Sequence, residues 1–136
     1  MPNAAPARAR AEPRILVFST SGISDPGIDL AGSSHMSYSP AVSVLSVPCS
    51  GGVDPRWIVQ ALGAGFDGVF VAADGGDCAL LPDCTARTAR VVERAQALLT
   101  AAGSDPRRVK MAAICSVCAE SFVNHMRQFG EALRAL

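Results

Sequence analysis

The sequence lacks the features that mark several large classes of protein. Its 136 residues include 12 basic and 12 acidic side chains, so no excess charge favours nucleic acid or a membrane surface. No apolar run approaches the roughly 18 residues needed to span a bilayer. The N-terminal arginines are not followed by the apolar region of a signal peptide. We therefore expect a cytoplasmic protein that binds neither nucleic acid nor membrane.

Motifs of several enzyme classes are also missing. The chain has no Walker loop, no dinucleotide fingerprint and no Ser-His-Asp spacing. Aromatic residues make up 5% of the chain, with one Trp and one Tyr, and none lies in segment 74–84, where a flavin would need a stacking partner. The hydroxyl-rich segment 19–22 is therefore interpreted as a turn and helix cap rather than as part of an FMN site.

What the sequence does contain is a regular alternation of strand and helix patterns. Apolar runs of strand length are followed four times by segments with helical periodicity. This alternation predicts an α/β fold, a flavodoxin-like doubly wound sheet of four parallel strands in the order 2-1-3-4. A single domain over residues 14–136 is expected to follow a disordered tail over residues 1–13. The predicted strands cover residues 14–20, 41–48, 68–73 and 109–114, and the predicted helices residues 28–36, 55–64, 85–102 and 116–136.

Helical spacing also predicts which side chains face the core. The expected core residues of the last three helices are Trp57, Ile58, Ala61, Leu62, Ala89, Val92, Leu98, Leu99, Phe122, Met126, Phe129 and Leu133.

Cys49 stands where a strand pattern gives way to a helix. It follows the apolar run of residues 42–48, and two glycines separate it from Asp54-Pro55. Asp at the N-cap and Pro at the first helical position together predict a helix start. In a parallel sheet this junction lies at the carboxyl edge, where cofactors bind.

The other four cysteines are expected at the same edge. Cys78 and Cys84 fall in the loop after the third strand, and Cys115 and Cys118 just after the fourth. A disulfide framework is typical of small secreted chains, which this chain does not resemble. Thiolates gathered on one edge suit a soft metal centre, and iron–sulfur clusters are usually held by four Cys ligands.

Two alternatives remain open from the residues alone. Cys115-Ser116-Val117-Cys118 at a strand-to-helix junction is also the arrangement of a redox-active dithiol. A structural zinc site is chemically possible, although a domain with this core does not need one. The familiar ferredoxin spacing of cysteines is absent.

Four segments resemble the delta subunit family of methyl-viologen-reducing hydrogenase. They are Asp29-Leu30-Ala31-Gly32, Val47-Pro48-Cys49-Ser50-Gly51-Gly52-Val53-Asp54-Pro55, Phe66-Asp67-Gly68-Val69-Phe70-Val71-Ala72 and Gly76-Asp77-Cys78. The similarity extends from about Ile15 to the C-terminus. It implies a small electron-transfer subunit with a [2Fe-2S] cluster and no substrate chemistry of its own. It also implies two kinds of partner, a hydrogenase or other dehydrogenase and a heterodisulfide-reductase-like flavoprotein.

The chain departs from that family at several cysteine positions. Thr20 and Ile23 stand where the family carries a C-x-x-C pair, and Ala73-Asp74 stands where it has a further cysteine. Only Cys49 and Cys78 match family cysteines. One hypothesis is a cluster with relocated ligands, Cys49 and Cys78 with Cys115, Cys118 and, as a further candidate, Cys84. The other is a cluster-free dithiol or adaptor subunit of the same kind of complex.

Overall fold

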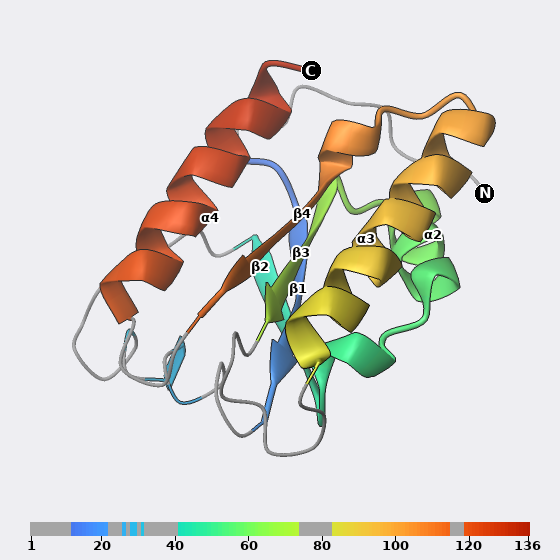
Figure 1. Ribbon diagram of the computed structural model, residues 1–136. Coiled ribbons are helices and arrows are strands. Elements are labelled where there is room, and N and C mark those ends of the chain that lie inside the picture. The colour runs from blue at the N-terminus through green and yellow to red at the C-terminus, as the bar shows by residue number, and fades with distance from the viewer. Residues whose placement is uncertain are drawn as a thin grey trace.

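The computed structural model describes residues 12–21, 26, 28–29, 31, 41–73, 83–114 and 119–136, and within them four strands form one central sheet (Figure 1). Neighbouring strands are parallel and lie in the order β2-β1-β3-β4. This order confirms the predicted fold. The strands are β1 (Ile15–Thr20), β2 (Val42–Val47), β3 (Gly68–Ala73) and β4 (Val109–Ala113).

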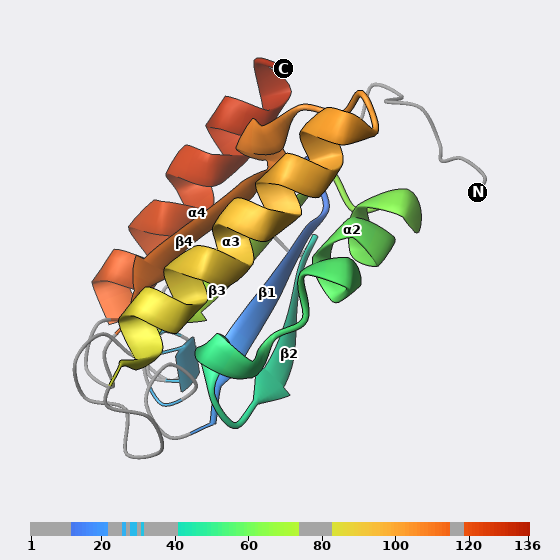
Figure 2. The same ribbon diagram turned by 45° about the vertical axis from the view of Figure 1, so that its right-hand side comes forward.

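Helices cover both faces of the sheet. Figures 1 and 2 show α2 and α3 on one face and α4 on the other, the arrangement expected of a doubly wound sheet. Two short 3-10 helices precede α2 and β4. The helical elements are η1 (Ser50–Gly52), α2 (Pro55–Gly63), α3 (Cys84–Ala101), η3 (Pro106–Arg108) and α4 (Ala119–Arg134).

The sheet divides the core into two apolar layers. Every residue of β3 is buried, as expected for a central strand covered on both faces. On one face Val17 and Phe70 lie in the same cluster as Phe122 and Phe129 of α4. On the other face the cluster joins strand residues to α2 and α3, and includes Phe18, Ile58, Val71, Val92 and Leu99. The four core residues predicted for the last helix are all buried.

The predicted core positions of Trp57 and Leu98 are wrong. Trp57 is 46% exposed and Leu98 is 45% exposed. Each precedes a residue that does face the sheet, Ile58 at 0% and Leu99 at 3%. Adjacent helical residues point about 100° apart, so only one of each pair can enter the core. The Trp57 ring instead lies beside Phe18, with ring centroids 6.4 Å apart.

Two predicted elements fall on residues outside the described ranges. These are most of the helix over residues 28–36 and most of the tail over residues 1–13, and both stay predictions. Ile28 and Ala31 are described and are buried. No helix in the described part of the chain is long and apolar enough to cross a membrane.

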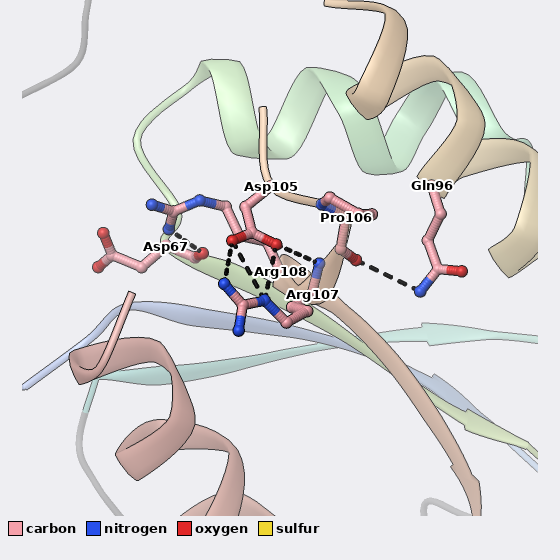
Figure 3. A network of polar contacts seen from close by, with 6 residues as sticks. All are labelled: Asp67, Gln96, Asp105, Pro106, Arg107 and Arg108. Carbon is pink, nitrogen blue, oxygen red and sulfur yellow. Dashed lines mark hydrogen bonds and ion pairs between the residues drawn. The ribbon is translucent and has the colours of Figure 1, made fainter. Parts of the chain in front are cut away.

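The amino ends of the strands are joined by a polar network, which Figure 3 shows in part. Asp67 and Arg14 exchange hydrogen bonds of 2.7 Å, which link the starts of β3 and β1. Arg108 Nη1 donates to the Asp67 carbonyl at 2.8 Å. Gln96 Nε2 of α3 donates to the Val109 carbonyl at 3.2 Å. Together these bonds fix β1, β3, β4 and α3 relative to one another at this end.

Candidate metal centre at the carboxyl end of the sheet

Cys49 lies two residues beyond β2, as the sequence predicts. Its backbone is extended, with φ −150° and ψ 132°, and its carbonyl accepts a hydrogen bond from Gly52 N at 3.1 Å. This bond closes the short helix η1 between the cysteine and α2. The predicted helix start is confirmed, because the Asp54 carboxylate accepts from Arg56 N at 2.9 Å and Pro55 is the first residue of α2.

Cys84 is placed differently from the prediction. The sequence pattern puts it in the loop after β3, whereas the structure makes it the first residue of α3, after Asp83 at the N-cap. The helix therefore begins one residue earlier than the Thr85 start predicted by periodicity. In Figure 1 helix α3 begins on the side of the sheet toward which the strand arrowheads point.

The structure brings these two cysteines into contact. Cys49 Sγ lies 3.2 Å from Cys84 Sγ, although the residues are 35 positions apart. No disulfide joins them. Cys49 is 9% exposed and Cys84 is 1% exposed, so the pair is nearly closed to solvent. The predicted gathering of cysteines at this edge is thus observed for two of the five.

Two buried hydroxyl groups surround the Cys84 sulfur. Ser50 Oγ lies 3.5 Å from Cys84 Sγ and 2.8 Å from Thr88 Oγ1, and Thr88 Oγ1 donates to the Cys84 carbonyl at 2.8 Å. Because the Thr88 proton is used in that bond, Thr88 accepts from Ser50, and Ser50 in turn can accept from the Cys84 thiol. The neutral thiol therefore fits a closed ring of donors and acceptors.

Sequence reasoning missed Ser50 and Thr88. Both are 0% exposed. Ser50 follows Cys49 directly, and Thr88 lies one helical turn after Cys84, so it shares a helix face with that cysteine. A search for polar residues one turn from each cysteine would have found Thr88.

The carboxylates next to the cysteines are paired with arginines. The Arg56 side chain donates to Asp54 and, with the Arg56 backbone N–H, lowers the pKa of that carboxyl to about 2. Arg87 lowers the pKa of Asp83 through a side-chain hydrogen bond of 2.9 Å. This pairing leaves the thiols as the soft donors of the site, which favours a thiolate-binding metal over Mg²⁺ or Ca²⁺.

The Sγ separation fits two ligands of one metal. Thiolates on a tetrahedral metal with bonds of about 2.3 Å lie roughly 3.8 Å apart, so the pair needs to open by only about 0.6 Å. No group of three or more metal-binding side chains occurs within the described residues. Cys78, Cys115 and Cys118 lie outside those residues, so the predicted ligand set beyond the observed pair stays a prediction.

The described chain reaches this edge of the sheet at Ile114, one residue before Cys115 in the sequence. The Ile114 amide donates to the Ala73 carbonyl at 3.0 Å, so the backbone still follows the end of β3 one residue before Cys115. Segment 74–82, which includes Cys78, connects the end of β3 to Asp83.

Over residues 15–136 the sequence matches the family described as methyl-viologen-reducing hydrogenase, delta subunit. It is 36% identical to the F420-non-reducing hydrogenase iron-sulfur subunit of Archaeoglobus profundus over 126 residues, which is 92% of this chain and 91% of the relative. It is 34% identical over 109 residues to the F420-non-reducing hydrogenase vhu iron-sulfur subunit of Methanopyrus kandleri, covering 79% of this chain and 82% of the relative.

A similar stretch occurs inside a much larger protein. One component of the ferredoxin/F420H2-dependent CoB-CoM heterodisulfide reductase of Methanosarcina acetivorans is 27% identical over 124 residues. Those residues are 91% of this chain but only 16% of the relative. The same kind of domain is therefore found both as a separate chain and as part of a longer reductase chain.

Proposed function

Because the chain belongs to the methyl-viologen-reducing hydrogenase delta subunit family, we propose that it is an electron-transfer subunit with a [2Fe-2S] cluster. The observation that carries this proposal is the contact between two buried thiols, 3.2 Å apart, at the carboxyl end of the sheet. Thiolates are the usual ligands of such clusters. The relatives are named as iron-sulfur subunits, which supports the same assignment.

The proposed ligands begin with Cys49 and Cys84. Two more come from Cys78, Cys115 and Cys118, which follow β3 and β4 in the sequence. With neighbouring strands about 4.8 Å apart, β3 lies roughly 10 Å and β4 roughly 14 Å from β2, so the residues that follow β3 and β4 would have to extend across the end of the sheet to share a centre with Cys49. Cys84 is included because its sulfur contacts that of Cys49.

The protein around the two thiols suits an electron relay. A bound iron–sulfur cluster accepts and passes on one electron at a time. Cys84 is 1% and Cys49 9% exposed, so the pair is largely shielded from bulk water. The Ser50 hydroxyl can rotate to donate to the Cys84 sulfur once that sulfur is a thiolate, and hydrogen bonds to sulfur tune the potential of such centres.

The proposed partners are a heterodisulfide-reductase-like flavoprotein and a hydrogenase or other dehydrogenase. The relatives that are separate chains are named as hydrogenase subunits. The relative in which the domain is part of a longer chain belongs to a heterodisulfide reductase. A domain found in both settings is suited to carry electrons between them.

A cluster-free dithiol subunit is the second candidate. The same 3.2 Å contact between Cys49 and Cys84 supports it, because two thiols at this distance form a two-electron dithiol–disulfide couple. The two candidates differ in metal content and in the number of electrons exchanged.

Expression and purification without oxygen, with iron and sulfide supplied, tests the proposal. We expect brown protein with about two irons and two labile sulfides per chain and an EPR signal after one-electron reduction. Colourless, iron-free protein whose thiols titrate as a two-electron couple would support the second candidate and overturn the first.

A further inference from the structure

We propose that Cys49 and Cys84 are a modification site, where a hydroperoxide forms an intramolecular disulfide when no metal is bound. The bond itself follows from the geometry of the two thiols. Its consequence, that oxidation blocks cluster loading, rests on the function proposed above.

The two sulfur atoms need only a small movement to bond. They lie 3.2 Å apart, and a disulfide bond is about 2.05 Å long, so a shift of roughly 1.2 Å brings them together. Cys49 is at the N-cap of the short helix η1 and Cys84 is in the first turn of α3, so neither lies inside a strand. Neither residue has to leave the sheet ladder for the bond to form.

The two cysteines have unequal access to an oxidant. Cys49 keeps 9% of its surface exposed, whereas Cys84 keeps 1%. We therefore assign Cys49, the more exposed residue, as the thiol that reacts first with a small hydroperoxide, and Cys84, whose sulfur lies 3.2 Å away, as the resolving thiol. Such a pairing of an accessible with a resolving cysteine is the usual arrangement of reversible thiol oxidation.

The disulfide between Cys49 and Cys84 forms in two steps. The Cys49 sulfur attacks the peroxide, the O–O bond breaks, and the products are Cys49 sulfenic acid and one water when the oxidant is hydrogen peroxide. The Cys84 sulfur then attacks the Cys49 sulfur, which forms the S–S bond and releases the hydroxyl group with the Cys84 proton as a second water. The two thiols lose two electrons, and the peroxide gains them.

The surrounding hydroxyl groups tolerate the loss of the Cys84 proton. Ser50 Oγ keeps its hydrogen bond to Thr88 Oγ1 at 2.8 Å, and Thr88 keeps its bond to the Cys84 carbonyl at 2.8 Å. The weak contacts of the thiol with Ser50 at 3.5 Å and with Thr88 at 3.9 Å lose their proton. Oxidation therefore leaves neither buried hydroxyl group without a partner. The disulfide would then occupy the two thiols proposed as metal ligands.

Peptide mapping of the full-length chain tests the proposal. The chain is freed of iron with a chelator, treated with one equivalent of hydrogen peroxide, alkylated and digested with a protease that cleaves before Asp. The Asp positions place Cys49 in peptide 29–53, Cys78 in 77–82, Cys84 in 83–104, and Cys115 with Cys118 in 105–136. We expect one cross-linked product, of peptides 29–53 and 83–104, that dithiothreitol separates. A dominant link between any other two peptides, or no link, would overturn the proposal.

Two variants test the order of the steps. In Cys84→Ser the sulfenic acid on Cys49 has no resolving thiol, so a dimedone-type reagent should label peptide 29–53. Cys118→Ser is the matched control and should still form the 49–84 link. If Cys84 in the Cys49→Ser variant is labelled as fast as Cys49 in the Cys84→Ser variant, the assigned order of the steps is contradicted. Thermal unfolding without a reducing agent is an independent measurement. A disulfide that closes the loop between Cys49 and Cys84 should raise the Tm of the oxidised protein by about 10 °C.

This mapping also separates the two proposals. If the peroxide-treated chain carries the 49–84 link but the anaerobic protein never binds iron, the modification site stands and the cluster assignment fails. If iron is bound and the link does not form, only the modification site fails. Oxidised protein that binds iron as well as reduced protein would overturn the proposed block on loading.

Discussion

The two ends of the parallel sheet are built from different chemistry. At the amino end, Asp67, Arg14 and Arg108 join the starts of three strand regions through charged side chains and backbone carbonyls. At the carboxyl end, Cys49 and Cys84 meet in a buried cluster of sulfur and hydroxyl groups. The amino end holds strands together with groups that bind one another. The carboxyl end gathers donors that a soft metal or an oxidant can use.

The same Asp-Pro-Arg motif occurs at both ends of the sheet. Asp54-Pro55-Arg56 begins α2 shortly after Cys49, and Asp105-Pro106-Arg107 begins η3 at the opposite end. In each, the Asp carboxylate accepts from the backbone and the side chain of the Arg two residues later. The motif starts a helix in both places, so it does not itself define a functional site. The two ends differ because Cys49 precedes the copy at the carboxyl end and supplies a thiol there.

The largest expected effect is the loss of bound iron when either cysteine is replaced. Cys49→Ser or Cys84→Ser should reduce the iron content of anaerobically prepared protein to below about a tenth of the wild-type value, because a hydroxyl is a poor replacement for a soft thiolate ligand. Arg107→Ala at the amino end is the control and should retain iron. Iron analysis with circular dichroism measures both. Equal iron loss in the control would remove the distinction between the two ends.

Gly68→Ala tests the amino end of β3. An added Cβ would lie 2.6 Å from Leu133 Cδ1 and 2.8 Å from Phe129 Cζ, so these two buried side chains of α4 would have to shift. We expect a loss of about 1–3 kcal/mol in the free energy of unfolding, the usual cost of overpacking. Gly63→Ala is the matched control because nothing lies within 4 Å of its added Cβ. Urea unfolding that shows equal stability for both variants would contradict the close packing.

Thr88→Val tests the hydroxyl ring at the carboxyl end. The change removes the donor to the Cys84 carbonyl and the partner of Ser50 while it keeps the side-chain shape. A cost of about 1–2 kcal/mol is expected for the buried group left unpaired. Thr100→Val provides the comparison, since its hydroxyl makes the same type of bond, to Gln96 O, on the exposed side of α3. A Thr88 variant as stable as the Thr100 variant would argue against the ring.

The smallest expected effect is a change in thermal stability with pH. The Arg partners lower the pKa of Asp54 and of Asp105 to about 2, below the usual value near 3.8. The stability that these carboxylates contribute is therefore present above pH 4 and is lost as the pH falls from about 4 to 2. Thermal unfolding of the wild type and of Asp54→Asn/Asp105→Asn between pH 6 and 2 measures it. The double variant should show the shallower loss of Tm over that range, and parallel curves would speak against the pairing.

Much of the fold could be predicted because its signals are local. Gly68–Ala73 is an uninterrupted apolar run, and Asp54-Pro55 marks a helix start, so the positions of strands and helices follow from patterns within short segments. The strand order is predicted from the doubly wound fold that the alternation of strands and helices indicates. The predictions for Trp57 and Leu98 failed because each has an apolar neighbour, and only the packed structure decides which of the two faces the sheet.

The candidate site was predictable only in outline. That Cys49 would lie at the carboxyl edge follows from the order of strand and helix. That its neighbour is Cys84 does not, since the contact joins residues 35 positions apart and depends on where α3 begins. Ser50 carries no sequence signal of its own because hydroxyl residues are common in turns, and Thr88 is marked only by its spacing of one helical turn from Cys84.

X-ray absorption at the iron edge of the anaerobically prepared protein tests whether Cys49 and Cys84 hold a two-iron centre. We predict a first shell composed of sulfur, with iron–iron scattering from the neighbouring metal. We also predict that Cys84→Ser protein does not retain this spectrum. A wild-type spectrum with a nitrogen and oxygen shell and no neighbouring iron would contradict the assignment, because the iron would then not be held by these thiols at the carboxyl end of the sheet.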